Sequence, residues 1–210
     1  KLGADHPDTL TSMSNLAFTY GELGQRDKAL AMQEKVLAAQ QAKLGADHPD
    51  TLTSMNNLAF TYGELGQRDK QLAMNEKVLA ASQAKLGADH PNTLISMSNL
   101  AITFRKVGQR EKALSLQLKS VTGRQRTLGR DHPDTLNEMI STAVTYIEMD
   151  RYAQAMPLVE ETLTLSRARL GDSAPQTVQA MKLLQSIYLK QGLAAKAAEM
   201  AQAESTQASV

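Results

Sequence analysis

The chain has 210 residues, a formal net charge of +1 and 42% hydrophobic residues, but only 4% aromatic residues and no Cys. The lack of Cys excludes a disulfide framework and a cysteine-based zinc site, and the near-neutral charge gives no overall attraction to nucleic acid or membrane. No apolar run approaches the ~20 residues that span a bilayer, and the first residues do not resemble a secretory signal, so we expect a soluble cytoplasmic protein without a membrane partner.

A short string recurs along the whole chain at a constant spacing of 42 residues. It reads LGADHP at 2–7, 44–49 and 86–91, LGRDHP at 128–133 and LGDSAP at 170–175. The spacing divides the chain into five repeats, 1–42, 43–84, 85–126, 127–168 and 169–210. Self-similarity at such a period predicts one continuous solenoid over 1–210, and because the chain begins and ends in register we expect a piece of a longer array.

Each repeat has the pattern of two helices. In the first repeat, apolar residues recur at helical spacing, and Pro7 suits a first helical position because its missing N–H would be unpaired there. We expect a first helix from Pro7 to Gly21 that stops before Gly24, a left-handed C-cap. A second helix should run to about Ala42 before Gly45 interrupts it. The five repeats then predict ten helices, with Met13 and its counterparts in the core.

The residues of this pattern resemble a known family. Leu16, Ala17, Tyr20, Gly24 and Ala29 are similar to the Leu, small, Tyr, Gly and Ala positions of the tetratricopeptide signature. The 42-residue period and the elements HPDTL and NLA resemble its kinesin-light-chain-like variant. The resemblance implies an all-α, right-handed superhelical solenoid of five helix-turn-helix repeats, with ten antiparallel helices. It also implies a protein or peptide ligand held on the concave face.

Repeats one and two differ at four positions only, which are Ser14/Asn56, Ala29/Gln71, Gln33/Asn75 and Gln40/Ser82. Two of these positions depart from the family pattern. Gln33 replaces a bulky aromatic residue of the second helix, and Gln71 stands where a small residue normally allows close helix contact. The second departure predicts a locally looser second repeat.

The four histidines invite a metal or catalytic interpretation, since each follows an Asp. They recur one per repeat, so stacked helix pairs would keep them roughly 10 Å or more apart, too far to share one zinc ion. Each precedes the Pro of a helix start, which favours a capping role. There is no Ser-His-Asp set, phosphate loop or HExxH element, so we expect no enzyme activity, no metal and no cofactor.

The family register places the ligand on first-helix positions that avoid the apolar stripe. The candidate ligand-binding residues of repeats one to three are Asn15, Phe18, Asn57, Phe60, Asn99, Ile102, Arg105 and Lys106. The three asparagines form a ladder whose amides can donate to and accept from an extended peptide backbone. Alternatively, they bond between adjacent helices and hold the stack in register.

Charge is uneven along the chain. Repeat three carries eight basic and two acidic residues, whereas repeat four carries three basic and seven acidic residues. Neighbouring repeats can simply neutralise each other. Alternatively, an acidic ligand segment docks near Arg105 and Lys106. A nucleic-acid partner is the weakest interpretation, because no aromatic platform accompanies the basic residues.

Two functions follow as predictions. The leading one is an interaction scaffold or sensor module that binds a peptide or partner domain on its concave face. The alternative is self-assembly, in which chains stack end to end into a continuous superhelix, because repeat one has no polar cap over its apolar residues.

Overall fold

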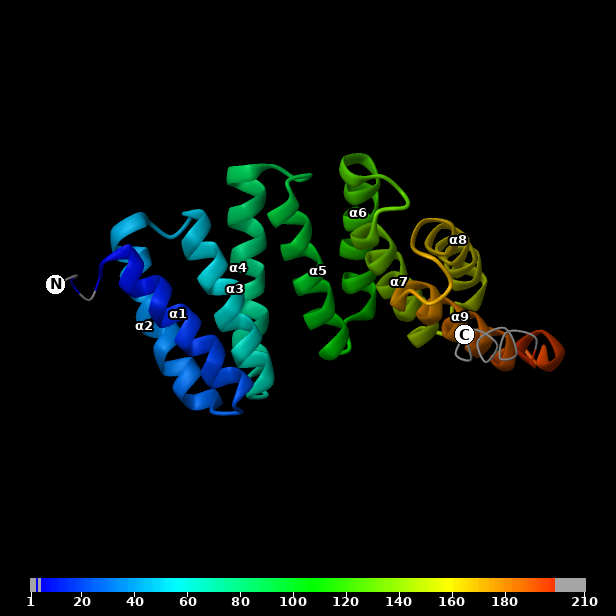
Figure 1. The fold of residues 1–210 in the computed structure, drawn as a ribbon, viewed down its shortest axis with the longest axis horizontal. Coiled ribbons are helices and arrows are strands. Elements are labelled where there is room, and N and C mark those ends of the chain that lie inside the picture. The colour runs from blue at the N-terminus through cyan, green and yellow to red at the C-terminus, as the bar shows by residue number, and fades with distance from the viewer. Residues whose placement is uncertain (1–2, 4, 199–210) are drawn as a thin grey trace. The chain divides into compact units, whose positions relative to one another are not determined.

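A computed structural model describes residue 3 and residues 5–198 of the chain, and its regular elements are α-helices (Figure 1). The helices are α1 (Pro7–Glu22), α2 (Arg26–Leu44), α3 (Pro49–Glu64), α4 (Arg68–Leu86), α5 (Pro91–Lys106), α6 (Arg110–Leu128), α7 (Pro133–Glu148), α8 (Tyr152–Leu170) and α9 (Pro175–Lys190). Residues 194–198 are helical too, and the rest of the predicted tenth helix lies outside the described residues. The prediction of an all-α chain of helix pairs is confirmed.

The first helix of repeats one to four starts at a histidine cap. His48, for example, has an extended backbone, and its Nδ1 accepts a hydrogen bond from the backbone N–H of Asp50 at 3.2 Å. The same bond is made by His6, His90 and His132. In repeat five, Ala174 takes the cap position and makes no such bond. The capping role predicted for the histidines is therefore confirmed.

Glycines end the helices where the sequence predicts. Helix α1 ends at Glu22, and Gly24 follows with a φ of 71°, in the left-handed region that suits glycine. Helix α2 runs to Leu44, and Gly45 ends it with a φ of 95°. The predicted ends at Gly21 and Ala42 are thus correct to within a turn.

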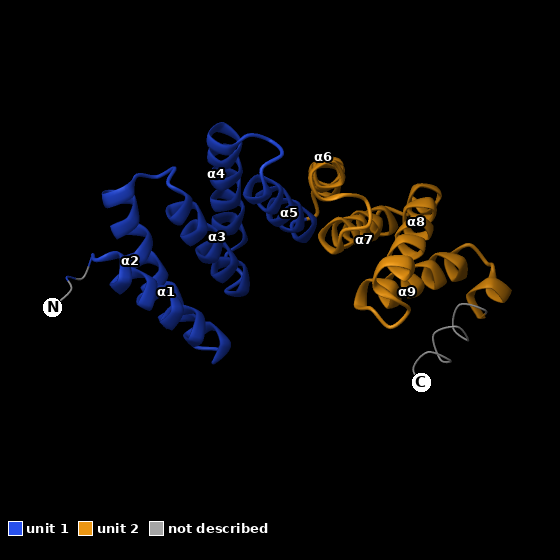
Figure 2. Ribbon diagram, turned by 45° about the horizontal axis from the view of Figure 1, so that its top comes forward, with its two compact units in different colours: residues 1–107 blue, residues 108–210 orange. Residues whose placement is uncertain are grey.

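The chain forms two compact units, residues 1–107 and 108–210 (Figure 2). In the first unit each helix packs against the next one in sequence, from α1 to α5. Its core cluster joins Leu37 of α2, Val78 of α4 and four residues of α3, which are Leu52, Met55, Leu58 and Tyr62. Helix α3 therefore lies between α2 and α4, and its apolar residues are buried by both.

The second unit contains α6 to α9, which also pack in sequence order. Its larger core cluster joins small and aliphatic residues of α7, α8 and α9, among them Ala143, Val159 and Ile187. Along the chain the predicted core methionines Met55, Met97, Met139 and Met181 are buried, whereas Met13 is half-buried. Met13 differs because no described helix packs on α1 from the side opposite α2.

Ion pairs link repeats three and four within the second unit. Arg110 of α6 lies 3.5 Å from Glu148 of α7, and Arg124 Nε lies 3.7 Å from Glu138. Glu111 and Arg151 form a further pair. For these residues the charge asymmetry of the sequence reflects neutralisation between neighbouring repeats.

The prediction of a looser second repeat is wrong. Gln71 is only 7% exposed and lies over Gly63, whose missing side chain leaves room for it. Arg68 Nη1 donates to both the Gly63 carbonyl and Gln71 Oε1, at 2.8 and 3.0 Å. Because the glycine compensates for the larger glutamine, α3 and α4 remain packed together.

Candidate functional site

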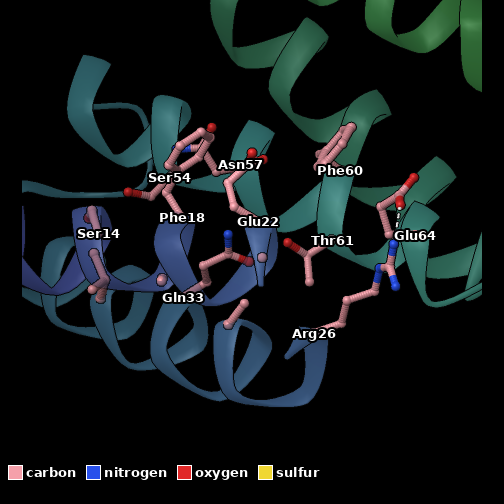
Figure 3. Close-up of a pocket in the computed structure, with 14 residues that line it drawn as sticks. Ser14, Phe18, Glu22, Arg26, Gln33, Ser54, Asn57, Phe60, Thr61 and Glu64 are labelled. Carbon is pink, nitrogen blue, oxygen red and sulfur yellow. Dashed lines mark hydrogen bonds and ion pairs between the residues drawn. The ribbon is translucent and has the colours of Figure 1, made fainter. Parts of the chain in front are cut away.

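A pocket of about 510 Å³ opens between α1, α2 and α3 of the first unit (Figure 3). Its residues are Ser14, Ala17, Phe18, Gly21 and Glu22 of α1, Arg26, Ala29, Gln33 and Val36 of α2, and Ser54, Asn57, Phe60, Thr61 and Glu64 of α3. We refer to it as the first pocket. Its volume falls in the range of ~300–1,000 Å³ that is usual for ligand sites.

Two exposed phenylalanines line the first pocket. Phe18 of α1 is 69% exposed, and Phe60, the same position of α3, is 67% exposed. Each of these rings gains free energy when a partner covers it, because burial removes its apolar surface from water. The small residues Ala17 and Ala29, which are both buried, also line the pocket.

Polar groups line the rest of this pocket. Arg26 Nη2 of α2 lies 3.0 Å from Glu64 Oε2 of α3, and the pair closes one end of it (Figure 3). Glu22 adds a second carboxylate. Gln33 lies at the base, and its Oε1 is buried without a hydrogen-bond partner among the described residues.

Two smaller pockets lie in the same unit, and each of the three pockets is lined by at least one of the predicted asparagines. The second, of about 350 Å³, is lined by both Asn15 and Asn57. The third, of about 320 Å³ between α3, α4 and α5, is lined by Asn57 and Asn99. Asn57 therefore faces each of the three pockets and occupies the centre of the predicted ladder.

The asparagines of the ladder lie in two kinds of surroundings. Asn99 is half-buried, and its Nδ2 donates to Asn56 Oδ1 of the preceding repeat at 3.5 Å. It thus bonds between helices. Asn15 and Asn57 are exposed on the pocket surface, where their amides can face a ligand.

The remaining predicted residues, Ile102, Arg105 and Lys106, lie at the C-terminal end of α5. Ile102 and Lys106 are exposed and Arg105 is half-buried, but none of them lines the three pockets described above. The structure thus brings together Phe18, Phe60 and Asn57, and it leaves the basic end of α5 as a separate surface.

The sequence prediction missed the floor of the first pocket. The floor is lined by Gly21 and by three residues of the second helix of repeat one, which are Arg26, Ala29 and Gln33. A signal was present, because Ala29 and Gln33 are two of the four positions at which repeats one and two differ. The prediction considered only first-helix positions, and so it left out the helix beneath.

Within the part of the chain that the structure describes, no three His, Asp or Glu side chains converge as a metal site would require. Nor is any helix in this part both long and apolar enough to cross a membrane. The residues that line the first pocket offer hydrogen-bonding groups, charged groups and apolar surface.

Comparison with known proteins identifies the family of this helical repeat. Two family models described as tetratricopeptide repeat match the chain, one over residues 8–84 and the other over 93–134 and 140–175. The chain belongs to the tetratricopeptide repeat family. Tetratricopeptide repeats (TPRs) generally mediate protein–protein interaction, and such scaffolds are typically not enzymes. No curated protein has a sequence that matches the chain.

Solved TPR structures show the same fold. The nearly identical TPR-like repeats of a Podosopora anserina protein assigned as a kinesin light chain are 28% identical, with a TM-score of 0.86, and the match covers 96% of this chain and 95% of that one. A singly substituted form of those repeats is 27% identical, with a TM-score of 0.88 and coverage of 100% and 98%. BtubC (BKLC) from P. vanneervenii is 21% identical, with a TM-score of 0.85 and coverage of 96% and 81%, which supports the fold alone.

Proposed function

We propose that this TPR chain is a protein-interaction module that binds an extended peptide segment of a partner protein in the first pocket. The observation that carries the proposal is the pair of exposed rings, Phe18 and Phe60, on opposite helices of an open pocket. Asn57 extends this surface with an amide that can bond to a peptide backbone. Binding without catalysis accounts for a site made of aromatic, amide and paired charged groups.

The basic end of α5 supports a further part of the proposal, namely an acidic group on the same ligand. Arg26 and Arg110 each pair with a glutamate of the following repeat, Glu64 and Glu148. Arg68 is the equivalent arginine of repeat two. The residue that corresponds to Glu64 and Glu148 in the repeat after it is Lys106, which is exposed. A carboxylate of the ligand would supply the negative charge that this position lacks, and its contribution should weaken with salt.

A selection from a display library of random decapeptides tests the proposal. An enriched peptide, made synthetically, is titrated into the protein and followed by fluorescence anisotropy. Phe60→Ala and Asn57→Ala should each weaken binding about tenfold or more. Leu189→Ala is the matched control, because Leu189 is also a well-exposed apolar residue but belongs to α9. Equal affinity of all variants, or a library without binders, would contradict the proposal.

A second candidate function is end-to-end association of two chains through α1. Leu16 is 44% exposed, whereas Leu58, the same residue of the next repeat, is 2% exposed because α2 covers it. A helix of a second chain that packs on α1 as α2 packs on α3 would bury Leu16 in the same way. Sedimentation velocity over a concentration series tests this: association should be lost in Leu16→Asp and kept in Leu189→Asp. A monomer at all concentrations would contradict it.

A further inference from the structure

Three of the four positions at which repeats one and two differ line the first pocket, namely Ser14, Ala29 and Gln33. Ala29 of α2 corresponds to Gln71 of α4, as Ser14 corresponds to Asn56 and Gln33 to Asn75. Gly21 and Gly63 are equivalent glycines, and Arg26 and Arg68 are equivalent arginines. The two repeats therefore share the glycine and the arginine, but the residue beside them is the small Ala29 in repeat one and the larger Gln71 in repeat two.

In repeat two the glutamine fills the space above the glycine. A Cβ atom added to Gly63 would lie 2.5 Å from Gln71 Nε2, so the two residues are in direct contact. Gly63 and Gln71 are both buried as a result. Arg68 holds the glutamine there through the bond to its Oε1 at 3.0 Å.

In repeat one the same space is open. A Cβ atom added to Gly21 would meet no atom within 4 Å, and Gly21 is exposed. Gln33, which also lines the pocket, has a buried Oε1 without a hydrogen-bond partner in the described chain. Its counterpart in repeat two, Asn75, donates a hydrogen bond to Thr103 Oγ1 at 2.9 Å. Both observations indicate that the base of the first pocket is incompletely filled by the protein itself.

We infer that the space over Gly21 and Ala29, which we term the repeat-one notch, receives a single apolar side chain of the bound peptide, and that Gln71 closes the equivalent position of repeat two. Ala29 is thus the residue that determines where the peptide is anchored, and Gln71, which lines none of the three pockets, leaves repeat two without a notch. The inference rests on the proposed function, since it assigns a position within the same pocket.

The charged residues around the notch indicate which type of peptide residue lies next to the apolar anchor. Glu22, Arg26 and Glu64 line this end of the first pocket, and Arg26 is already paired with Glu64. The remaining carboxylate favours a Lys or Arg of the peptide next to the anchor. The occupant is therefore an extended segment with an aliphatic or aromatic residue adjacent to a basic one.

Two substitutions that exchange the repeats test the inference with the random decapeptide library and the enriched synthetic peptide. Ala29→Gln copies repeat two, where glutamine is accommodated over a glycine, and should weaken binding of that peptide about ten- to a hundredfold. Gln71→Ala copies repeat one, should leave the affinity for that peptide unchanged, and should open a second notch. A library selected on Gln71→Ala should then enrich a second apolar residue about three positions from the first, because repeats are ~10 Å apart and an extended chain rises ~3.3 Å per residue.

The outcomes separate this inference from the proposed function. A peptide that loses affinity with Phe60→Ala and Asn57→Ala but binds Ala29→Gln as tightly as the unchanged protein overturns the inference and leaves the proposed function standing. Peptides indifferent to all of these changes, or an absence of enriched peptides, overturn both. Thermal unfolding of each variant, followed by circular dichroism, checks that the helices are retained, and loss of binding by a well-folded Ala29→Gln supports the inference.

Discussion

Helices α1 and α3 have the same sequence except at Ser14 and Asn56, yet their side chains lie in different surroundings. In α3 the residues that face α2 are buried, and Leu58 and Tyr62 belong to the core cluster. In α1 the counterparts Leu16 and Tyr20 are exposed and half-buried. The comparison shows that, in stacked helix pairs, the apolar residues on this side of a first helix are buried by the second helix of the preceding repeat. The repeat to which they belong does not bury them.

The largest expected difference between the two helices concerns their leucines. Leu58→Ala should lower the free energy of unfolding by ~2–5 kcal/mol, because it removes a fully buried side chain. Leu16→Ala should lower it by less than ~1 kcal/mol, since nearly half of that side chain is exposed to water. Equilibrium urea unfolding measures both. Equal losses would indicate that α1 is covered in solution, as end-to-end association requires.

A smaller difference is expected for the amides of the second helices. Asn75→Ala removes a buried hydrogen bond to Thr103 and should reduce the free energy of unfolding by ~1–2 kcal/mol. Gln33→Ala removes an amide whose Oε1 has no partner among the described residues, and its cost should be below ~1 kcal/mol. The same urea titration checks the pair, and a larger cost for Gln33→Ala would show that this amide is bonded in solution.

The equivalent glycines Gly21 and Gly63 should respond differently to substitution by alanine, since one substitution should stabilise the chain and the other should not. Gly21→Ala should stabilise the chain by ~0.5–1 kcal/mol, because alanine loses less backbone entropy in a helix and its Cβ meets open space. Gly63→Ala should not stabilise it, since Gln71 would have to move and lose its bond to Arg68. Thermal unfolding of the double variant Gly63→Ala/Gln71→Ala is the control, and there the gain should return. A gain from Gly63→Ala alone would contradict this account.

The smallest expected effect is a loss of stability at alkaline pH that comes from Tyr62. Its burial, together with the hydrogen bond to Glu34 Oε1 at 3.1 Å, raises the pKa of its hydroxyl above the usual 10.0. The folded state therefore holds this proton more tightly than the unfolded state. The resulting stability is present below pH 10 and is lost as the pH rises through the raised pKa. Unfolding at several alkaline pH values measures the loss, which should be smaller in Tyr62→Phe; an unchanged pH dependence would count against it.

Part of the candidate site could be predicted from the sequence, and the part that was missed has a definite cause. Phe18, Phe60 and Asn57 were named because the resemblance to the family implies a ligand on the first helices, and the helical period places these residues off the apolar stripe. Arg26, Ala29 and Gln33 were missed because they belong to another helix, and a one-dimensional period says nothing about which helix forms the floor beneath. Gln71 was misjudged for a related reason, since Gly63 opposite it makes the room that its size requires.

By itself the sequence determined the repeat, the helix boundaries and the caps, because these depend on residues close together in the chain. A histidine and a proline start a helix, and a glycine ends it, whatever lies nearby. Only the tertiary structure decided which of two identical leucines is buried and which of two equivalent glycines lines an open pocket. The physical reason is that burial and shape are properties of two packed surfaces, and each repeat supplies only one of them.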